Sequence, residues 1–412
     1  MADQNPAAVQ TATLQTAAVQ TADALTAESV VSDELLTRIR SRAATHDREN
    51  TFPEDDLREL AEVGYLRMLV PVEQGGLGFG FARVAREQTR LATAAPATAL
   101  AINMHLVWTG VATLLGRQGD HSLDWLLEEA AAGEVFAFGN SEAGNDLVLF
   151  GSRTRAVPTE DGGYAFTGRK IFTSLSPVWT RLGVFGLDDS DPEAPLLVHA
   201  FLDRGPGVET LDDWDTVGMR ATQSRTTVLS EARAPASRVF RKLPAGPSAD
   251  PLIFGIFAGF EILLAAVYTG IGQRAVELAV EAAQRRTSMK NGGRPLAHDP
   301  DIRWKVAEAG ILQDGIPPQI QALATDVDEG VPHGAAWFPK LVGLKVRATE
   351  NARLVVDQAL RVSGGSSLAN SSELGRLYRD VVAGMFHPSD GESAHATVAT
   401  SLLGPVPEPG SE

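Results

Sequence analysis

The chain has no cysteine among its 412 residues. That excludes disulfide bonds, a thiolate nucleophile, and any zinc or iron–sulfur site built on cysteine ligands. It also has no run of 18 uninterrupted apolar residues, so we expect no membrane span. The N-terminal residues contain no basic stretch ahead of an apolar one, so no signal peptide is predicted. These absences favour a cytoplasmic address.

Positive charge is scarce. The chain carries 36 Lys and Arg residues against 52 Asp and Glu, a formal net charge of −16. A surface of this sign repels phosphate backbones and anionic lipids, so we expect neither nucleic acid nor an anionic membrane as a partner. The 8 histidines are scattered singly, without an HxxxH or HExxH pair, which predicts no metal site.

Two segments that could indicate other chemistry do not match the motifs they resemble. The glycine-rich run 75–80 does not match G-x-G-x-x-G and lacks a strand-to-helix setting, so it does not predict a dinucleotide-binding loop. The run 139–144 has one residue too many for a Gly-x-Ser-x-Gly nucleophile elbow. We therefore expect neither a Rossmann-type site nor a serine hydrolase.

The first third of the chain is predicted to be helical after a biased tail. Residues 1–31 are rich in Ala, Thr and Gln, which predicts a disordered or loosely helical tail. From Ser32 the apolar residues follow helical spacing, and a second helix is expected to start at Pro53. The segment 81–135 looks helical throughout. We therefore expect an N-terminal α-helical domain over residues 32–135.

The segment that follows has the composition of a ligand-binding strand edge. The run 136–146 ends in small and hydrogen-bonding residues, among them Ser141 and Asn145. Such residues bring backbone N–H and hydroxyl groups close to a planar polar ligand. We expect this run to face a ligand.

A second run, 168–174, places the ring of Phe172 beside the hydroxyl groups of Thr173 and Ser174. Between the two runs, Asp-Gly-Gly at 161–163 lies between alternating segments and predicts a β-hairpin. The two runs would then form neighbouring edges of one antiparallel sheet.

The remaining chain predicts more strands and then helices. Four helical patterns follow the sheet, and the second is broken by two prolines at 317 and 318. The expected helices cover 258–286, the region from 301 on, 338–362 and 374–403. We therefore predict an α+β fold with an N-terminal helical domain, a middle antiparallel β-domain over 136–245, a C-terminal four-helix bundle over 246–404 and a tail at 405–412.

The order of these segments resembles the acyl-CoA dehydrogenase superfamily over about residues 32–404. The middle domain of that family surrounds the FAD ring with a Thr-Glu-Pro-Gly-Ala-Gly-Ser-Asp-like run and a Gly-x-Lys-x-Trp-Ile-Thr-Asn-like run. Here Ser141 stands for Thr, the loop that follows is two residues shorter, and Phe172 and Ser174 replace Trp and Thr. The resemblance implies FAD as the cofactor, held by Ser141, Asn145, Phe172, Thr173 and Ser174.

The resemblance also implies contacts between subunits. In the family, an Arg at the end of the first bundle helix reaches the FAD pyrophosphate of the neighbouring subunit, and a Gly-Gly-x-Gly turn meets the adenine part. Arg285 or Arg286 and the pair Gly364 and Gly365 occupy those positions, with Ser367 in place of the third glycine. A homodimer or homotetramer is therefore expected.

The catalytic base is where the chain departs from the family. The family base is often the Glu of a Tyr-Glu-Gly-Thr run, but the register set by Arg376 and Asp380 places His387 at the Tyr and Pro388 at the Glu. Proline supplies neither a carboxylate nor a backbone N–H. Asp390 and Glu392, one turn on, are candidate replacements if the loop is remodelled, and Glu261 is a better one, one position off the site used by some family members.

Two enzyme classes stay open. The first is α,β-dehydrogenation of a small acyl thioester carried by CoA or an acyl carrier protein, with an electron-transfer partner. The second is a flavin-dependent monooxygenase or N-oxygenase of the same fold, which takes reduced flavin from a flavin reductase and often uses a nearby histidine such as His387. A flavin-binding member without turnover is the third interpretation.

Overall fold

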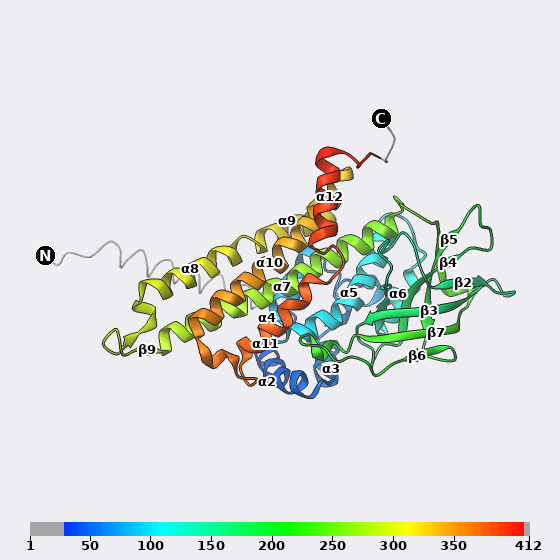
Figure 1. The fold of residues 1–412 in the computed structure, drawn as a ribbon. Coiled ribbons are helices and arrows are strands. Elements are labelled where there is room, and N and C mark those ends of the chain that lie inside the picture. The colour runs from blue at the N-terminus through cyan, green and yellow to red at the C-terminus, as the bar shows by residue number, and fades with distance from the viewer. Residues whose placement is uncertain (1–28, 408–412) are drawn as a thin grey trace.

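In the computed structural model the chain is described from residue 29 to residue 407. The helices form an elongated body, and an eight-stranded sheet lies at one end of it (Figure 1). Of the two predicted tails, only residues 29–31 and 405–407 fall within the described range. The order of helices, sheet and helices confirms the predicted α+β fold.

The N-terminal helices are α2 (Asp33–Glu49), α3 (Glu54–Glu62), α4 (Phe81–Ala94), α5 (Pro96–Arg117) and α6 (Asp124–Ala131). The hydroxyl of Ser32 caps α2 by accepting a hydrogen bond from the backbone N–H of Leu35 at 3.2 Å. The prediction of continuous helix over 81–135 was wrong. Pro96 forces Ala95 out of the helical region, to φ −144° and ψ 83°, and Gly119 turns the chain at φ +83°.

The strands are β1 (Phe136–Gly139), β2 (Arg155–Pro158), β3 (Tyr164–Thr173), β4 (Arg181–Asp188), β5 (Leu196–Asp203), β6 (Val208–Thr210), β7 (Arg225–Ala234) and β8 (Val239–Pro244). Their order in the sheet is β6-β7-β3-β2-β4-β5-β8, and β1 pairs in parallel with β4. Strands β2 and β3 are antiparallel, with Pro158 opposite Tyr164. This register confirms the hairpin predicted at 161–163.

The C-terminal helices are α7 (Pro251–Arg285), α8 (Pro300–Asp314), α9 (Pro317–Asp328), α10 (Trp337–Ser363), α11 (Glu373–Val381) and α12 (Gly391–Leu403). The short strands β9 (Thr287–Ser288) and β10 (Arg294–Pro295) form a hairpin after α7. Helix α8 ends before Pro317, as predicted. The single helix predicted over 374–403 was wrong, because Pro388 and the positive φ of Ser389 (+58°) separate α11 from α12.

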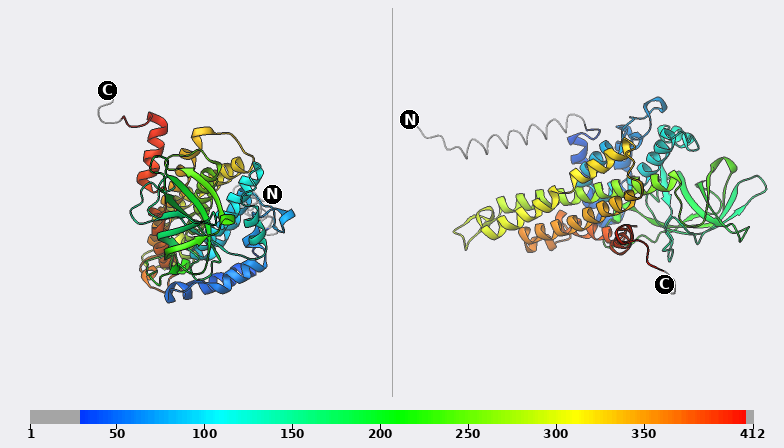
Figure 2. Two further views of the ribbon diagram at one scale, coloured as in Figure 1. Left: turned by 90° about the vertical axis from the view of Figure 1, so that its right-hand side faces the viewer. Right: turned by 90° about the horizontal axis from the view of Figure 1, so that it is seen from above.

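Helices α5 and α7 run through the core of the body. Both are long and apolar enough to cross a membrane, but 94% and 83% of their most apolar windows are buried in the protein. Trp108 of α5 lies against the sheet, where a Cβ atom at Gly183 would be only 2.3 Å from its ring. Its indole N–H also donates to the carbonyl of Ala137 at 3.0 Å. These contacts fix the sheet at the end of the helical body (Figure 2).

Candidate active site

The two predicted ligand-facing runs lie side by side in the structure. The backbone N–H of Ile171 donates to the carbonyl of Ser141 at 2.9 Å, so the end of β1 is held beside the end of β3. The neighbouring residues, Lys170 before Ile171 and Glu142 after Ser141, form an ion pair in which Nζ of Lys170 lies 2.7 Å from Oε1 of Glu142. The end of β1 and the end of β3 therefore lie next to each other, and together they form what we call the sheet edge.

Glu142, whose role was not evident from the sequence, organises the loop between the two runs. Its carboxylate accepts hydrogen bonds from Lys170, from the backbone N–H groups of Arg153 and Thr154, and from the hydroxyls of Ser152 and Thr154. Burial alone would raise the pKa of Glu142, but the charge of Lys170 and these donors hold it at about 2. Burial lowers the pKa of Lys170 to about 8 against the opposing effect of Glu142, so both groups are ionised at neutral pH.

The predicted cofactor residue Asn145 uses its side chain within the same loop. Its Nδ2 donates to Glu142 at 3.0 Å and to the carbonyl of Gly151 at 2.9 Å, and its Oδ1 accepts from the N–H of Leu147 at 3.1 Å. The amide thus folds the loop onto itself. A contact between Asn145 and a cofactor stays a prediction.

The second run presents the aromatic face that the sequence suggested. Phe172 has a positive φ of +58°, is 55% exposed, and sets its ring edge-on to Trp214 with centroids 6.2 Å apart. The Ser174 hydroxyl is 2.7 Å from that of Ser224, on the segment that carries Trp214. The Thr173 hydroxyl is buried without a hydrogen-bond partner among the described residues.

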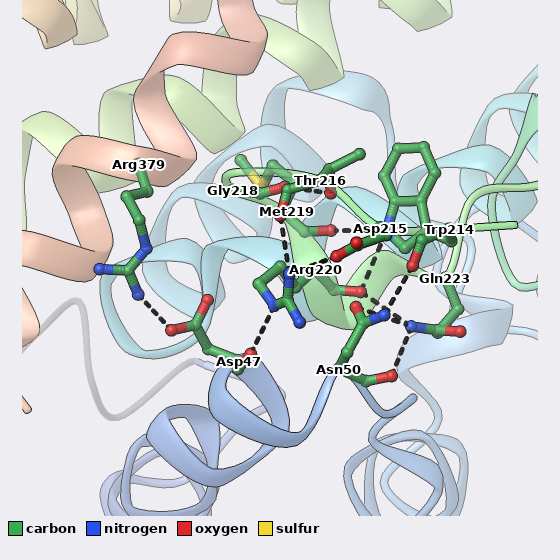
Figure 3. A network of polar contacts seen from close by, with 10 residues as sticks. All are labelled: Asp47, Asn50, Trp214, Asp215, Thr216, Gly218, Met219, Arg220, Gln223 and Arg379. Atoms are coloured by element: carbon green, nitrogen blue, oxygen red, sulfur yellow. Dashed lines mark hydrogen bonds and ion pairs between the residues drawn. The ribbon is translucent and has the colours of Figure 1, made fainter. Parts of the chain in front are cut away.

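A polar network ties the segment 214–224 to the helical body (Figure 3). At the end of α2, the carbonyl of Asp47 accepts from Nε of Arg220 at 2.8 Å, and the Asp47 carboxylate pairs with Arg379 of α11. The side chain of Asn50 donates to the carbonyl of Trp214 at 2.6 Å. Helices from both ends of the chain thus hold this loop.

The same loop meets α11 through its backbone. The N–H of Met219 donates to Asp380 at 2.6 Å, and a Cβ atom at Gly218 would lie 2.0 Å from the carbonyl oxygen of Arg379. Burial raises the pKa of Asp380 to about 6, although Arg376 opposes this effect. Helix α11 is followed by a short 3-10 helix (Val382–Met385) and then by His387. The contact between the loop and α11 therefore helps to fix the position of the loop relative to the segment that carries His387.

The candidate base Glu261 is buried on α7. Its Oε1 accepts a hydrogen bond from the hydroxyl of Ser389, and its Oε2 is buried without a partner among the described residues. Burial raises the pKa of Glu261, while Ser389 and the cation of Lys345 act in the opposite direction. Burial therefore disfavours the ionised form of the Glu261 carboxyl.

His387 and Asp390 have different surroundings. Nε2 of His387 lies 2.8 Å from the hydroxyl oxygen of Tyr268 on α7. The residue is half-buried, and burial together with the charge of Lys345 lowers its pKa to about 3, so the ring is neutral. Asp390 caps α12 by accepting from the N–H and hydroxyl of Ser393 at 2.9 and 2.7 Å, and these bonds lower its pKa. The structure thus groups Glu261 with His387 and commits Asp390 to a helix end.

Arg286, Gly364 and Gly365 lie elsewhere. Strand β9, which directly follows Arg286, lies at the end of the body opposite the sheet (Figures 1 and 2). Arg286 donates to the carbonyls of Val362 and Ser363 at the end of α10, and Gly364 follows there at φ +71°. These residues and Ser141 can contact one cofactor only if a second subunit supplies one of the two sets.

The sheet edge offers unpaired polar atoms that suit a flavin ring. Asn140, between β1 and Ser141, is 6% exposed, yet neither its Oδ1 nor its Nδ2 has a partner within residues 29–407. The buried Thr173 hydroxyl is likewise free, and Phe172 supplies an exposed aromatic face. The pyrimidine part of an isoalloxazine alternates donors and acceptors, which such groups can satisfy. A flavin bound at this edge would supply two-electron redox chemistry.

Comparison with known protein families agrees with this geometry. The sequence profile for the N-terminal domain of acyl-CoA dehydrogenases matches residues 21–122, and the profile for the C-terminal domain matches residues 262–389. The chain is 29% identical over 373 residues to L-evernosamine nitrososynthase of a Micromonospora species, covering 85% of this chain and 84% of that protein. It is 28% identical over 371 residues to the putative acyl-CoA dehydrogenase YdbM of Bacillus subtilis, covering 86% and 91%.

Two further similarities bear on the cofactor and the chemistry. Dibenzothiophene monooxygenase of Rhodococcus erythropolis is 27% identical over 347 residues, covering 81% of this chain and 82% of that protein. The solved structure of KijD3 with FMN and a dTDP-linked amino sugar is 28% identical, with a TM-score of 0.78 and coverage of 90% and 91%. The two profile matches, to which these relatives conform, show that the chain belongs to the acyl-CoA dehydrogenase superfamily of flavin-dependent oxidoreductases.

Proposed function

We propose that this enzyme is a flavin-dependent monooxygenase that oxidises a nitrogen or sulfur atom of a small substrate. The supporting observation is that no carboxylate occupies the position of the family's base. Pro388 has no carboxylate, Asp390 is the cap of α12, and burial disfavours the ionised form of Glu261. Removing the α-proton of an acyl thioester needs a carboxylate that is ionised before the reaction starts.

Monooxygenation does not need that base. One atom of dioxygen enters the substrate and the other leaves as water, with two electrons from the reduced flavin. The neutral imidazole of His387, held by Tyr268, offers a hydrogen bond to oxygen or substrate without bringing a positive charge. The chain's resemblance to nitrososynthases and to dibenzothiophene monooxygenase supports nitrogen or sulfur as the oxidised atom.

This function implies a flavin reductase as the partner that supplies reduced flavin. FAD is the cofactor that the sequence resemblance implies, whereas the KijD3 structure contains FMN. Chromatography of the flavin released by heating the purified protein decides between the two. We also propose a cytoplasmic homodimer or homotetramer, because only a second subunit can bring Arg286 to the flavin; sedimentation velocity measures that assembly.

The experiment that tests the function begins with anaerobic addition of acyl-CoA thioesters of several chain lengths. We expect the oxidised flavin spectrum to stay unchanged. A reductase, NADH and oxygen should then allow oxidation of an amino sugar nucleotide or a thiophene, detected by mass. Bleaching of the flavin by any acyl-CoA would refute the proposal.

A second candidate function is dehydrogenation of a small acyl thioester on CoA or an acyl carrier protein, with an electron-transfer partner. Its support is the buried, unpartnered Oε2 atom of Glu261, which could accept a proton once the carboxyl is ionised. The resemblance to YdbM points the same way. Under this alternative, Glu261→Gln abolishes flavin bleaching by the active acyl-CoA, whereas the monooxygenase does not depend on that carboxylate.

A further inference from the structure

Lys345 is a buried cation directly beneath the segment that carries His387. It lies on α10, is 1% exposed, and donates from Nζ to the carbonyls of Gly384, His387 and Ser389 at 3.1, 3.2 and 3.0 Å. Among the described residues its recorded hydrogen bonds all go to these carbonyls. Lys345 is therefore bound to this one short piece of backbone.

Burial lowers the pKa of Lys345, and the three carbonyls together with the carboxyl of Glu261 oppose that effect. Moving such a cation out of water costs several kcal/mol unless dipoles or charges replace its hydration. The dipoles of Gly384, His387 and Ser389 point at Nζ and replace part of that hydration. The charge and the shape of the segment therefore depend on each other: without the cation, the three carbonyls lose the donor that they share.

Helix α7 holds the same three residues from another direction. Tyr268 bonds the ring of His387, and Glu261 accepts from the hydroxyl of Ser389. A Cβ atom at Gly384 would lie 2.8 Å from the ring of Tyr268. Residues 384, 387 and 389 are thus each contacted by both Lys345 and α7.

From this arrangement we infer that Lys345 is a positioning residue, whose ammonium group fixes the backbone of residues 384–389 and so holds His387 in place at the reaction site. The carbonyl of His387 is bound by Lys345 and its ring by Tyr268, so backbone and side chain are fixed together. The consequence for turnover rests on the proposed monooxygenase function. The effect on the backbone does not.

The first test measures amide hydrogen exchange in full-length, flavin-loaded protein. Lys345→Met keeps the length of the side chain and removes the charge, and Lys340→Met is the matched control on an exposed position of the same helix. We expect exchange in peptides covering residues 384–390 to become about tenfold faster in Lys345→Met and to stay unchanged in Lys340→Met. Unchanged exchange in Lys345→Met would overturn the inference.

The second test measures how much reduced flavin yields product and how much yields hydrogen peroxide. In Lys345→Met the product formed per reduced flavin should fall at least fivefold while peroxide rises, and Lys345→Arg, which keeps the charge, should recover part of the loss. Equal product yields in Lys345→Met and wild type would contradict a positioning role. If Lys345→Met does not fold, Lys345→Gln, which keeps a donor without the charge, replaces it in both measurements.

The two experiments distinguish a failure of the proposed function from a failure of the proposed role of Lys345. Faster exchange at residues 384–390 combined with no oxygenation by the wild-type enzyme refutes the proposed function and leaves the role of Lys345 standing. Oxygenation by the wild type with unchanged exchange in the variant refutes the role of Lys345 alone.

Discussion

Lys170 and Glu142 form an ion pair of 2.7 Å whose two side chains are 0% and 2% exposed. The pair joins β3, which carries Phe172, to the loop that follows Ser141. The two edges expected to hold the flavin are therefore attached to each other by a buried charge pair. A substitution that removes this ion pair should therefore disturb the position of both runs.

Removing one member of this pair tests its contribution to stability. Lys170→Met leaves the Glu142 carboxylate buried without its cation, and we expect the free energy of unfolding to fall by about 3–5 kcal/mol. Urea unfolding followed by circular dichroism measures the loss. Lys290→Met, at an exposed position, should change the free energy by less than about 0.5 kcal/mol. A loss below about 1 kcal/mol in Lys170→Met would show that the pair is not a major support.

The low pKa of Glu142 predicts how stability depends on pH. The folded protein holds that pKa at about 2, below the ordinary value of 4.5. The unfolded chain therefore binds a proton more readily, and the contribution of Glu142 is complete above pH 4.5 and is lost as the pH falls toward 2. In Glu142→Gln the difference in unfolding free energy between pH 6 and pH 3 should be smaller than in wild type. An equal or larger difference would contradict this assignment.

Asn140 should affect flavin binding and stability in opposite directions. Its unpaired buried amide costs the flavin-free protein free energy, so Asn140→Ala should leave flavin-free stability unchanged or raise it. The same change should weaken flavin binding about tenfold, because a hydrogen bond to the ring is lost. Titration by flavin fluorescence and thermal unfolding measure the two effects, with the exposed Asn370→Ala as control. Unchanged affinity would exclude a contact between Asn140 and the flavin.

Gly218 should tolerate no side chain. A Cβ atom there would lie 2.0 Å from the backbone oxygen of Arg379, so Gly218→Ala must push the loop away from α11. We expect a loss of at least about 2 kcal/mol in unfolding free energy together with weaker flavin binding. Gly310→Ala, in α8 with no atom near the new methyl group, should be neutral or slightly stabilising. Wild-type stability in Gly218→Ala would show that the two backbones are not packed this closely.

Local features of the fold could be predicted from the sequence. The hairpin at 161–163 and the end of α8 before Pro317 follow from turn residues and from the missing N–H of proline. The two runs expected to face a ligand were predicted in the same way, from small and hydroxyl residues at strand ends, and the structure places them side by side; their contact with a ligand stays a prediction. Each of these signals acts within a few residues of the chain.

The partners of buried charges could not be predicted in this way. Lys345 is 39 residues from Gly384, and Glu142 is 28 residues from Lys170. Which of the many charged residues becomes buried depends on how distant segments pack. The break between α11 and α12 was missed for a different reason: the helical pattern of 374–403 was given more weight than the local signal of the proline at 388.

The central claim is that this enzyme transfers oxygen rather than removing hydrogen from a thioester. The most direct measurement supplies ¹⁸O₂ to the complete system of enzyme, flavin reductase, NADH and an amino sugar nucleotide or a thiophene, and then weighs the product. We predict that each newly added oxygen atom in the product is ¹⁸O. Product without ¹⁸O, or a flavin reduced directly by an acyl-CoA in the absence of oxygen, would contradict the account.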